Sequence, residues 1–397
     1  MNRKYDLLIA GGGPAGLSAA YTAALGGLRV AVFERSKEVG YPIHSSGGSW
    51  IAEIRALGIP ERYMHPVHTG RFVARAEEAV FSYEKPVSCI LDVRGLYQYL
   101  AVTAAKAGAE ILPASHVEKV FFKKSLPAGL EVHGQGQYFA PLVIDASGMA
   151  GVLARQAGLS QECGRYGLGA EVDVVAPQWP QGTIALLFGS LAAPSGYGWI
   201  FPHGEERVRI GIGVIRPDTQ ADPKAHLHAL LQRPPAQISE HLPMKTAAII
   251  ETHTGAIPSA PPLLKTSSDG LLVVGDAGGL ISTLLGEGIR FAIELGRLAG
   301  EVAREAHQAG RFDGRFLSRF DRAWRTRYGR MFTWAEAANR RIARYDDEQW
   351  AGKIRLLRNL PAEVIPALLK GNWLEAGLFK TLWHASRKSS GEPKAKV

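Results

Sequence analysis

Three glycines near the N-terminus have the spacing of a phosphate-binding turn. Gly11, Gly13 and Gly16 follow the apolar residues 7–9 and precede an alanine-rich segment. In a strand–turn–helix unit the first glycine permits the tight turn, the second lets the backbone approach a pyrophosphate, and the third lets the helix pack closely on the strand. The helix N-terminus then offers free N–H groups to the phosphates. This spacing predicts dinucleotide binding.

A carboxylate closes the same unit. Glu34 ends the second apolar run, RVAVF, at about the 20-residue distance from the glycines that nucleotide-binding units show. It can accept hydrogen bonds from ribose hydroxyls and would repel a 2′-phosphate. An ordinary tight turn is the alternative, but the flanking strand, helix and acidic residue favour the nucleotide site. The sequence has no second such fingerprint, so we expect one tightly held dinucleotide, which suits a flavin.

The elements that must position these residues follow from apolar periodicity. The pattern predicts an α/β protein, in which a Rossmann-like nucleotide domain is interleaved with an antiparallel-sheet substrate domain and followed by a C-terminal helical segment. Residues 96–107 fit an amphipathic helix, and residues 138–144 fit a strand. Alternating patterns such as RVRIGIGVI within residues 165–256 indicate the antiparallel sheet. Residues 287–306 fit a long helix.

These patterns divide the chain into three predicted parts. The nucleotide-binding domain is discontinuous and takes residues 1–50, 88–160 and 265–310. The substrate domain takes residues 51–87 and 161–264. Residues 311–397 form the helical region, whose tail, residues 389–397, is expected to be disordered.

Composition fits a globular cytoplasmic protein. The chain has 397 residues, of which 46% are hydrophobic, enough for a large core. The sequence shows neither a signal-peptide pattern nor an apolar run long enough to cross a bilayer, so we expect no signal peptide and no membrane-spanning helix. Cys89 and Cys163 are the only cysteines, too few for a disulfide framework or a cysteine metal site, and no metal is expected.

Positive charge is concentrated at the C-terminal end. Residues 311–397 carry 19 Lys and Arg against 9 Asp and Glu, so their net charge of +10 accounts for the +9 of the whole chain. The same segment holds five of the eight tryptophans, namely Trp324, Trp334, Trp350, Trp373 and Trp383. One interpretation is a surface that binds an anionic membrane peripherally, at its inner face. A solvated basic helix face is the alternative, and no nucleic-acid-binding motif accompanies the charge.

Three further segments resemble the FAD-binding pattern of the p-hydroxybenzoate hydroxylase-like flavoproteins. They are Arg94 at a helix start, residues 145–148 (DASG) after a strand, and residues 275–279 (GDAGG) between a strand and a helix. The resemblance implies FAD as the cofactor, with Asp276 on its ribityl and pyrophosphate side. It also implies that residues 286–289 (GEGI) direct backbone N–H groups at the flavin ring.

Within that superfamily the chain resembles the geranylgeranyl reductases over nearly its whole length. Residues 197–202, YGWIFP, fit their Y-x-W-x-F-P signature. The resemblance implies that Tyr197, Trp199 and Phe201 line an isoprenoid chamber. The alternative is that the three aromatic residues form one face of a buried strand.

One departure from the family concerns the residues beside the flavin. Members often carry Cys-Gly-Gly there, whereas this chain has residues 45–48, SSGG. The thiol is absent, which puts the usual alkene chemistry or regioselectivity in question. His44 and Ser46 are the candidate catalytic residues, His44 as a proton donor; the alternative for His44 is a polar surface or capping group.

The cofactor-binding residues expected from the motifs and the resemblance are Gly11, Gly13, Pro14, Ala15, Gly16, Glu34, Arg35, Ser46, Gly47, Arg94, Asp276, Gly286, Gly288 and Ile289.

The resemblance implies an FAD-dependent reductase that saturates C=C bonds of a prenyl chain by hydride transfer from reduced flavin. Its partners would be an isoprenoid or lipid substrate and a source of electrons, either NAD(P)H or ferredoxin. Two alternatives remain open. One is a flavin-dependent monooxygenase or halogenase acting on a hydrophobic substrate, and the other is a noncatalytic flavin-bound lipid-binding protein.

Overall fold

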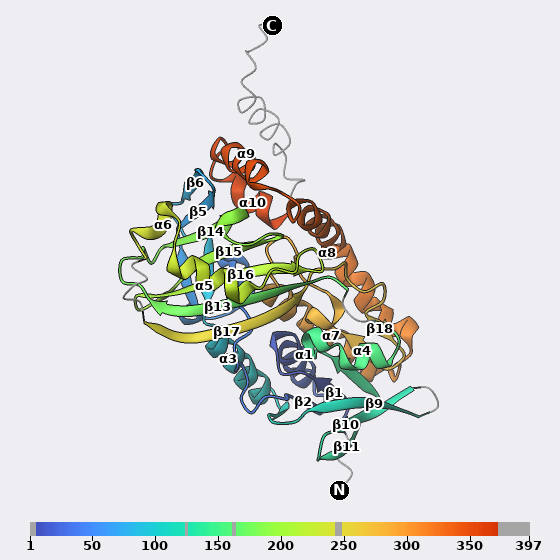
Figure 1. Ribbon diagram of the computed structural model, residues 1–397. Coiled ribbons are helices and arrows are strands. Elements are labelled where there is room, and N and C mark those ends of the chain that lie inside the picture. The colour runs from blue at the N-terminus through green and yellow to red at the C-terminus, as the bar shows by residue number, and fades with distance from the viewer. Residues whose placement is uncertain (1–4, 124–125, 161–163, 243–247, 372–397) are drawn as a thin grey trace, which may run out of the picture.

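Two large β-sheets dominate the molecule, with helices packed between and around them (Figure 1). The computed structural model describes residues 5–123, 126–160, 164–242 and 248–371. Within this part the arrangement is the α/β architecture that the sequence predicts, with one largely parallel and one largely antiparallel sheet.

The first sheet has six strands in the order β18-β19-β12-β1-β2-β8. Its strands are β1 (Leu7–Ala10), β2 (Val30–Phe33), β8 (Glu110–Leu112), β12 (Leu142–Asp145), β18 (Ser267–Ser268) and β19 (Leu271–Val273). All neighbours pair in parallel except β18 with β19. The central strands β1, β2 and β12 are buried at every residue, as expected for parallel strands covered on both faces.

Helices α1 (Pro14–Leu25), α3 (Val93–Lys106) and α7 (Ile289–Ala309) accompany this sheet. Two glycines set how closely α1 and α7 approach. A Cβ atom on Gly296 would lie 2.3 Å from the Ala15 carbonyl oxygen, and one on Gly300 would lie 2.5 Å from that of Ala19. Helices α3 and α7 confirm the helices predicted at residues 96–107 and 287–306, with small shifts of their ends.

The second sheet has seven strands in the order β17-β13-β16-β15-β14-β5-β6. They are β5 (Thr69–Ala74), β6 (Glu77–Ser82), β13 (Tyr166–Val175), β14 (Thr183–Phe188), β15 (Gly196–Gly204), β16 (Arg207–Arg216) and β17 (Ile249–Pro258). The antiparallel sheet predicted within residues 165–256 is confirmed. The early hairpin β5–β6 joins its edge through a parallel pairing of β5 with β14.

Smaller elements complete the fold. Strands β3 (Gly48–Trp50), β7 (Ser88–Leu91) and β4 (Met64–Val67) form one three-stranded sheet, and β9 (Val117–Lys123), β10 (Leu126–Val132) and β11 (Gly136–Phe139) form another. The short helices are α2 (Ile51–Ala56), α4 (Val152–Gln156), α5 (Pro223–Gln232) and α6 (Ala236–Ser239), with 3₁₀ turns at Glu61–Tyr63, Gly148–Ala150, Gly189–Leu191 and Gly275–Gly278.

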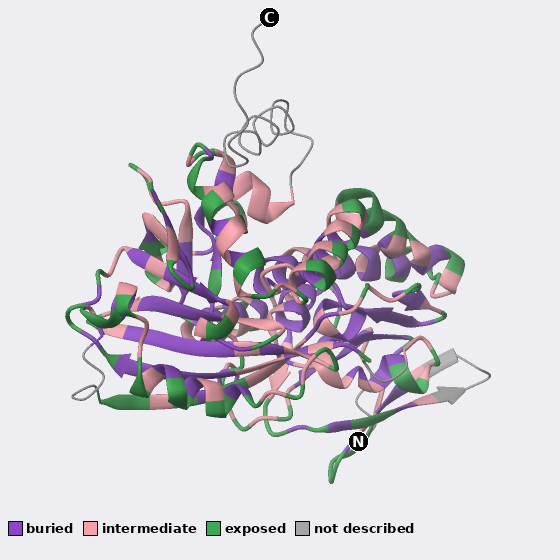
Figure 2. Cartoon of the chain, turned by 45° about the horizontal axis from the view of Figure 1, so that its top comes forward, coloured by how far each residue is buried: buried purple, intermediate pink, exposed green. Residues whose placement is uncertain are grey.

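The C-terminal segment is helical, as predicted, up to the end of the described residues. It comprises α8 (Gly314–Ile342), α9 (Asp347–Arg358) and α10 (Val364–Lys370). Helix α8 packs on α7 and on the edge of the first sheet, whereas α9 covers β5 and β6 of the second. Their outer faces are exposed while both sheets are largely buried (Figure 2).

The tryptophans of this segment correct one argument from the sequence. Trp324 is 1% exposed and donates its indole N–H to Thr266 Oγ1 at 2.8 Å, and Trp350 is also buried. Both are core residues because α8 and α9 fold back onto the sheets, so they cannot belong to a membrane-facing aromatic surface. Trp373, Trp383 and the tail at residues 389–397 lie outside the described residues. Among the described helices, none has the length and apolar character needed to span a bilayer.

Candidate active site

The glycine turn between β1 and α1 has the geometry that its spacing predicts. Gly11 has a φ of +111°, and a Cβ atom there would lie 2.1 Å from the Ala146 carbonyl oxygen. A Cβ on Gly16 would lie 2.0 Å from the Gly11 carbonyl oxygen. Around Gly13, by contrast, there is open space within 4 Å. The turn thus presents bare backbone at Gly13, at the N-terminus of α1, where a phosphate can approach closely.

A cavity extends from this turn and is called here the nucleotide cavity. Of the predicted cofactor residues, it is lined by Gly13, Pro14, Ala15, Asp276, Gly286, Gly288 and Ile289. Gly148, from the DASG segment of the FAD-binding pattern, also lines it. Its wall further contains residues that the sequence reasoning missed, among them Pro42, Val93 and Tyr97. These three carry no motif of their own, and only their position beside the glycine turn reveals them.

The chemistry of this cavity fits FAD. Burial raises the pKa of Asp276 to about 6, and within the described residues no donor hydrogen-bonds its carboxylate. A polar ligand with hydroxyl groups would satisfy that carboxylate, as a ribityl chain can. Gly286 and Gly288 lead into the N-terminus of α7, so the backbone N–H groups and helix dipole at that end face the cavity.

Other predicted cofactor residues take supporting positions. Gly11 and Gly16 shape the turn. The Glu34 carboxylate accepts hydrogen bonds from the backbone N–H groups of Gly12 (2.9 Å) and Ser36 (2.7 Å), which fixes it against the turn. Arg35, next to it, is exposed.

Arg94 lies at the start of α3, where the resemblance expects it, but does not line the nucleotide cavity. Its guanidinium pairs with the Glu38 carboxylate at 2.5 Å. About half of the arginine side chain is exposed.

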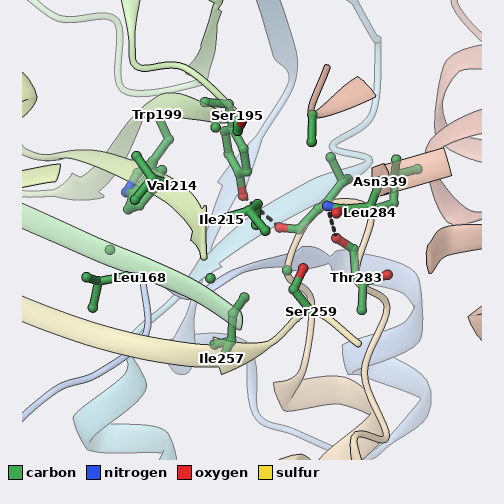
Figure 3. Close-up of a pocket in the computed structure, with 18 of the residues that line it drawn as sticks. Leu168, Ser195, Trp199, Val214, Ile215, Ile257, Ser259, Thr283, Leu284 and Asn339 are labelled. Carbon is green, nitrogen blue, oxygen red and sulfur yellow. Dashed lines mark hydrogen bonds between the residues drawn. The ribbon is translucent and has the colours of Figure 1, made fainter. Parts of the chain in front are cut away.

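A first apolar cavity lies between the second sheet and the C-terminal helices. Its sheet side includes Trp199, Val214 and Ile257, and its opposite side includes Thr283 and Asn339 (Figure 3). The Asn339 side-chain amide of α8 donates to the Thr283 carbonyl oxygen at 2.8 Å. Helix α8 therefore fastens the loop that leads to Gly286. Trp350 of α9 adds a further wall.

A second apolar cavity lies on the other side of Tyr197, toward the hairpin β5–β6. Its wall includes Phe72 and Phe81 of the hairpin, Phe201 of β15, and Ile365 and Leu369 of α10. The YGWIFP signature predicted Tyr197 and Phe201 as lining residues, and both line this cavity. The residues contributed by β5, β6 and α10 were missed, because they come from segments far apart in the chain.

The three cavities meet at one place. Ser45 and Gly286 line all three, and Tyr197 lines both apolar cavities. The Tyr197 hydroxyl donates to the Leu285 carbonyl oxygen at 2.7 Å, so β15 is fixed to the loop at this junction. A ligand chain in either apolar cavity can therefore reach the inner end of the nucleotide cavity.

The aromatic residues of β15 are both strand core and cavity wall, so the two interpretations of YGWIFP are compatible. Trp199 and Phe201 are each 8% exposed, yet Trp199 lines the first apolar cavity and Phe201 the second. Glycine makes room for the indole. A Cβ atom on Gly211 would lie 2.3 Å from the Trp199 ring, and one on Gly213 would lie 3.2 Å from it.

The loop that carries the catalytic candidates lies at the junction. His44 lines the first apolar and nucleotide cavities, and its Nδ1 lies 2.8 Å from the Thr254 carbonyl oxygen. Ser46 lines both apolar cavities, and Gly47 lines the second. Gly47 has a φ of +84°, with Leu91 backbone 2.7 Å from where a Cβ would be. The structure thus brings His44, Ser46 and Gly47 together near the glycine-rich end of α7.

A cluster of ionisable groups lies behind this loop. Asp173, Glu251 and His253 place potential metal-binding atoms within 4.8 Å of one another. However, Arg209 donates to both carboxylate oxygens of Asp173, at 2.7 and 2.9 Å. A guanidinium already supplies the positive charge that a metal ion would bring.

The sequence matches two family models. The model described as FAD dependent oxidoreductase matches residues 6–206, and the geranylgeranyl reductase catalytic domain matches residues 169–257.

Named relatives are similar along most of their length. Digeranylgeranylglycerophospholipid reductase 2 of Methanothermobacter thermautotrophicus is 35% identical over 345 residues, which cover 82% of this chain and 85% of the relative. Digeranylgeranylglycerophospholipid reductase 1 of Methanopyrus kandleri is 28% identical, covering 90% and 96%.

Solved structures share the fold. A geranylgeranyl bacteriochlorophyll reductase-like protein of Thermoplasma acidophilum superposes with a TM-score of 0.86 at 24% identity, covering 97% of this chain and all of the other. A flavin-dependent brominase superposes with a TM-score of 0.71 at 18% identity, covering 98% of both chains.

Proposed function

The chain belongs to the geranylgeranyl reductase family of FAD-dependent oxidoreductases, and on that premise we propose that it saturates C=C bonds in the geranylgeranyl-type chain of a prenyl lipid. The single observation that carries this proposal is the meeting of two apolar cavities with the nucleotide cavity at Ser45 and Gly286. An alkene threaded through either apolar cavity would come within reach of the flavin.

The residues present suit this chemistry. When bound and reduced, FAD supplies a hydride to one alkene carbon, and the other carbon needs a proton. Gly13 and the α1 N-terminus would hold the pyrophosphate, and Asp276 the ribityl hydroxyls. Trp199, Phe72 and Phe201 would surround the prenyl chain and exclude water. Burial of each CH₂ group contributes about 0.8 kcal/mol, so the chain itself can supply most of the binding energy.

Anaerobic single turnover tests the proposal. The purified FAD-bound protein is reduced with dithionite, so that the natural electron donor need not be known, and then mixed with a digeranylgeranyl glycerophospholipid. We expect the oxidised flavin spectrum to return and the lipid mass to rise by two hydrogens for each bond reduced. No mass change across a panel of prenyl lipids overturns the proposal. It would favour the noncatalytic lipid-binding alternative if oxygen chemistry were also absent.

A flavin-dependent halogenase or monooxygenase is the second candidate, because a brominase shares the fold with a TM-score of 0.71. At 18% identity the likeness extends to the fold alone. Oxygen separates the two functions. A monooxygenase or halogenase consumes O₂ with its substrate, whereas the reductase works without it.

A membrane surface is the proposed source of the lipid. Helix α8 carries eight arginines and two carboxylates, and all eight arginine side chains are exposed. Because each basic residue near an anionic leaflet contributes about 1 kcal/mol, this helix can hold the protein at such a surface. Electrons would come from NAD(P)H or from a ferredoxin-type partner.

A further inference from the structure

One carboxyl group lies in the wall of the first apolar cavity. Glu171 of β13 is 5% exposed, and its Oε2 accepts a hydrogen bond from the Trp199 indole N–H at 3.1 Å. It is the only carboxyl among the described residues that line this cavity, and it shares that wall with Ser46. A carboxyl group in such apolar surroundings is uncommon and needs a physical account.

Two carboxyl groups compete for one guanidinium behind the wall. Arg209 of β16 donates to both oxygens of Asp173 at 2.7 and 2.9 Å, but its Nε lies 3.8 Å from Glu171 Oε1. The bidentate pair holds Asp173 ionised, while Glu171 receives only a longer-range attraction and the indole N–H. The two carboxyl groups are therefore driven toward different protonation states, the arrangement by which paired carboxyl groups divide acid and base roles.

The surroundings of Glu171 favour its neutral form. Burial, aided by the nearby Asp173 charge, raises the pKa of Glu171 to about 7, against the opposing effects of Arg209 and the Trp199 indole N–H. From the neighbouring strands, Tyr197 on β15 and His253 on β17 also lie near this group, and burial holds the pKa of His253 below its ordinary value. These surroundings therefore favour a Glu171 carboxyl group that keeps its proton at higher pH than an exposed glutamate does.

The same guanidinium connects Glu171 to the cavity junction. Arg209 Nη1 donates to the carbonyl oxygens of Ser45 (3.3 Å) and Ser46 (3.4 Å), so it holds the loop that lines all three cavities. The carboxyl group and the loop that would flank the flavin are thus kept in a fixed relation by one buried side chain.

We propose that the Glu171 carboxyl group is the proton donor for alkene reduction in the first apolar cavity. This inference rests on the proposed function. It assigns to Glu171 the role that the sequence reasoning had given to His44, in a chain where the family's thiol is replaced by Ser46.

The step balances in atoms and electrons. One alkene carbon gains a hydride, which brings two electrons from the reduced flavin and leaves the flavin oxidised. The other carbon gains a proton as the Glu171 O–H bond breaks, so two C–H bonds replace the π bond. The Glu171 carboxylate that remains takes a proton from water after the saturated chain has moved on.

The other polar groups of the cavity are poorer donors. Burial raises the pKa of Tyr197 well above its ordinary value, and its hydroxyl hydrogen is engaged by the Leu285 carbonyl oxygen. The serine hydroxyls are far less acidic than a carboxyl group. His44 is the remaining rival, because it lies at the junction with one ring nitrogen near Thr254.

Glu171→Gln tests the assignment, because the amide keeps an acceptor for the Trp199 indole but has no acidic proton. We expect lipid-driven flavin reoxidation under anaerobic conditions to slow by at least about 100-fold, the scale of general-acid catalysis. FAD content, dithionite reduction and the lipid concentration for half-saturation should stay within about twofold. The wild-type rate should fall about tenfold per pH unit above pH 7. Glu171→Asp should show a similar decrease of the rate with pH, whereas Glu171→Gln should not.

Glu251→Gln is the matched control, since Glu251 lies on the adjacent strand β17, is 39% exposed and does not line the cavity. Its rate and pH profile should match those of the wild type. The inference is overturned if Glu171→Gln keeps the wild-type rate and its decrease above pH 7. It is also overturned if His44→Gln is the only variant that loses this decrease. If wild-type protein is not reoxidised by any prenyl lipid, the proposed function itself fails, which is a separate outcome.

Discussion

Gly211 is the residue that decides where the Trp199 indole can lie. Because a Cβ atom would come within 2.3 Å of that ring, Gly211→Ala must displace the indole, which lines the first apolar cavity. We expect turnover of prenyl lipid to fall at least about tenfold, with unfolding free energy lowered by about 1–3 kcal/mol from overpacking. Steady-state kinetics and thermal denaturation measure the two effects.

Gly169→Ala provides the comparison for this variant. Its Cβ atom would lie 3.5 Å from the same indole, which is ordinary van der Waals contact. We expect a much smaller loss of turnover than in Gly211→Ala. Equal losses in the two variants would show that the position of the indole is not the cause.

Asp276 makes the stability of the FAD-free protein depend on pH. Its pKa is about 6 in the folded protein against the ordinary 3.8, so the folded state binds this proton more tightly. Its contribution to unfolding free energy is therefore full below about pH 4 and is lost as pH rises through 6. Asp276→Asn removes the ionisation cost. Well above pH 6, the unfolding free energy of the FAD-free variant should therefore exceed that of the FAD-free wild type by about 3 kcal/mol.

Two measurements check this prediction. Chemical denaturation of both FAD-free proteins at pH 4 and pH 8 should show the difference only at pH 8. FAD retention on gel filtration should fall in the variant, since the amide is a weaker acceptor for hydroxyl groups. A variant less stable at both pH values would contradict the account.

Site residues that belong to a sequence motif were easier to predict than site residues that do not. Gly13 and Asp276 line the nucleotide cavity as expected, and Trp199 lines an apolar one. Glu171 was missed because its importance depends on Arg209, which lies on another strand and pairs with Asp173. No local pattern in the sequence expresses that competition.

At the scale of elements, the close contact of α7 with α1 supports the phosphate-binding turn. Gly296→Ala would place a Cβ atom 2.3 Å from the Ala15 carbonyl oxygen and push the two helices apart. We expect unfolding free energy to fall by about 1–3 kcal/mol and FAD to dissociate more readily. Gly329→Ala in α8, whose Cβ would have its nearest neighbour at 3.7 Å, should retain FAD fully.

Helix α9 closes the first apolar cavity through one aromatic contact. Trp350 stacks on Phe188 with ring centroids 4.3 Å apart, and it lines the cavity. Trp350→Ala should raise the lipid KM at least about tenfold while leaving the flavin spectrum and FAD content unchanged, because no wall of the nucleotide cavity is removed. Trp350→Phe keeps a ring and should recover most of the affinity. Loss of FAD in Trp350→Ala would contradict this division of roles.

Sequence periodicity identified most elements but not their neighbours. Strands β1 and β2, the antiparallel second sheet and the C-terminal helices were predicted. The single strand predicted at residues 138–144 is divided between β11 and β12, which belong to different sheets. The placement of the hairpin β5–β6 beside β14, and of α9 over that hairpin, was not predicted, because both depend on apolar surfaces that become complementary only after folding. The domain boundaries remain predictions.

At the scale of the whole molecule, the exposed arginines of α8 predict salt-sensitive binding to anionic vesicles. Vesicles containing phosphatidylglycerol should sediment the protein at low salt, whereas phosphatidylcholine vesicles or high salt should release it. The triple variant Arg322→Gln, Arg330→Gln and Arg341→Gln should weaken sedimentation at least about tenfold. The control changes three exposed lysines elsewhere, Lys37, Lys85 and Lys106, to Gln, with the same loss of charge. Equal weakening in both variants would show that net charge, not α8, governs binding.

The parallel pairing of β5 with β14 also has a consequence for biosynthesis. Thr69 of β5 aligns with Thr183 of β14, so the earlier strand leaves the ribosome more than a hundred residues before its partner. At ordinary translation rates that interval is on the order of 10 s. During it the hairpin β5–β6 presents an unpaired strand edge, the kind of surface that chaperones cover and that aggregates when they are scarce. Yield in a recombinant host should therefore depend on translation speed and chaperone supply more than on the stability of the finished protein.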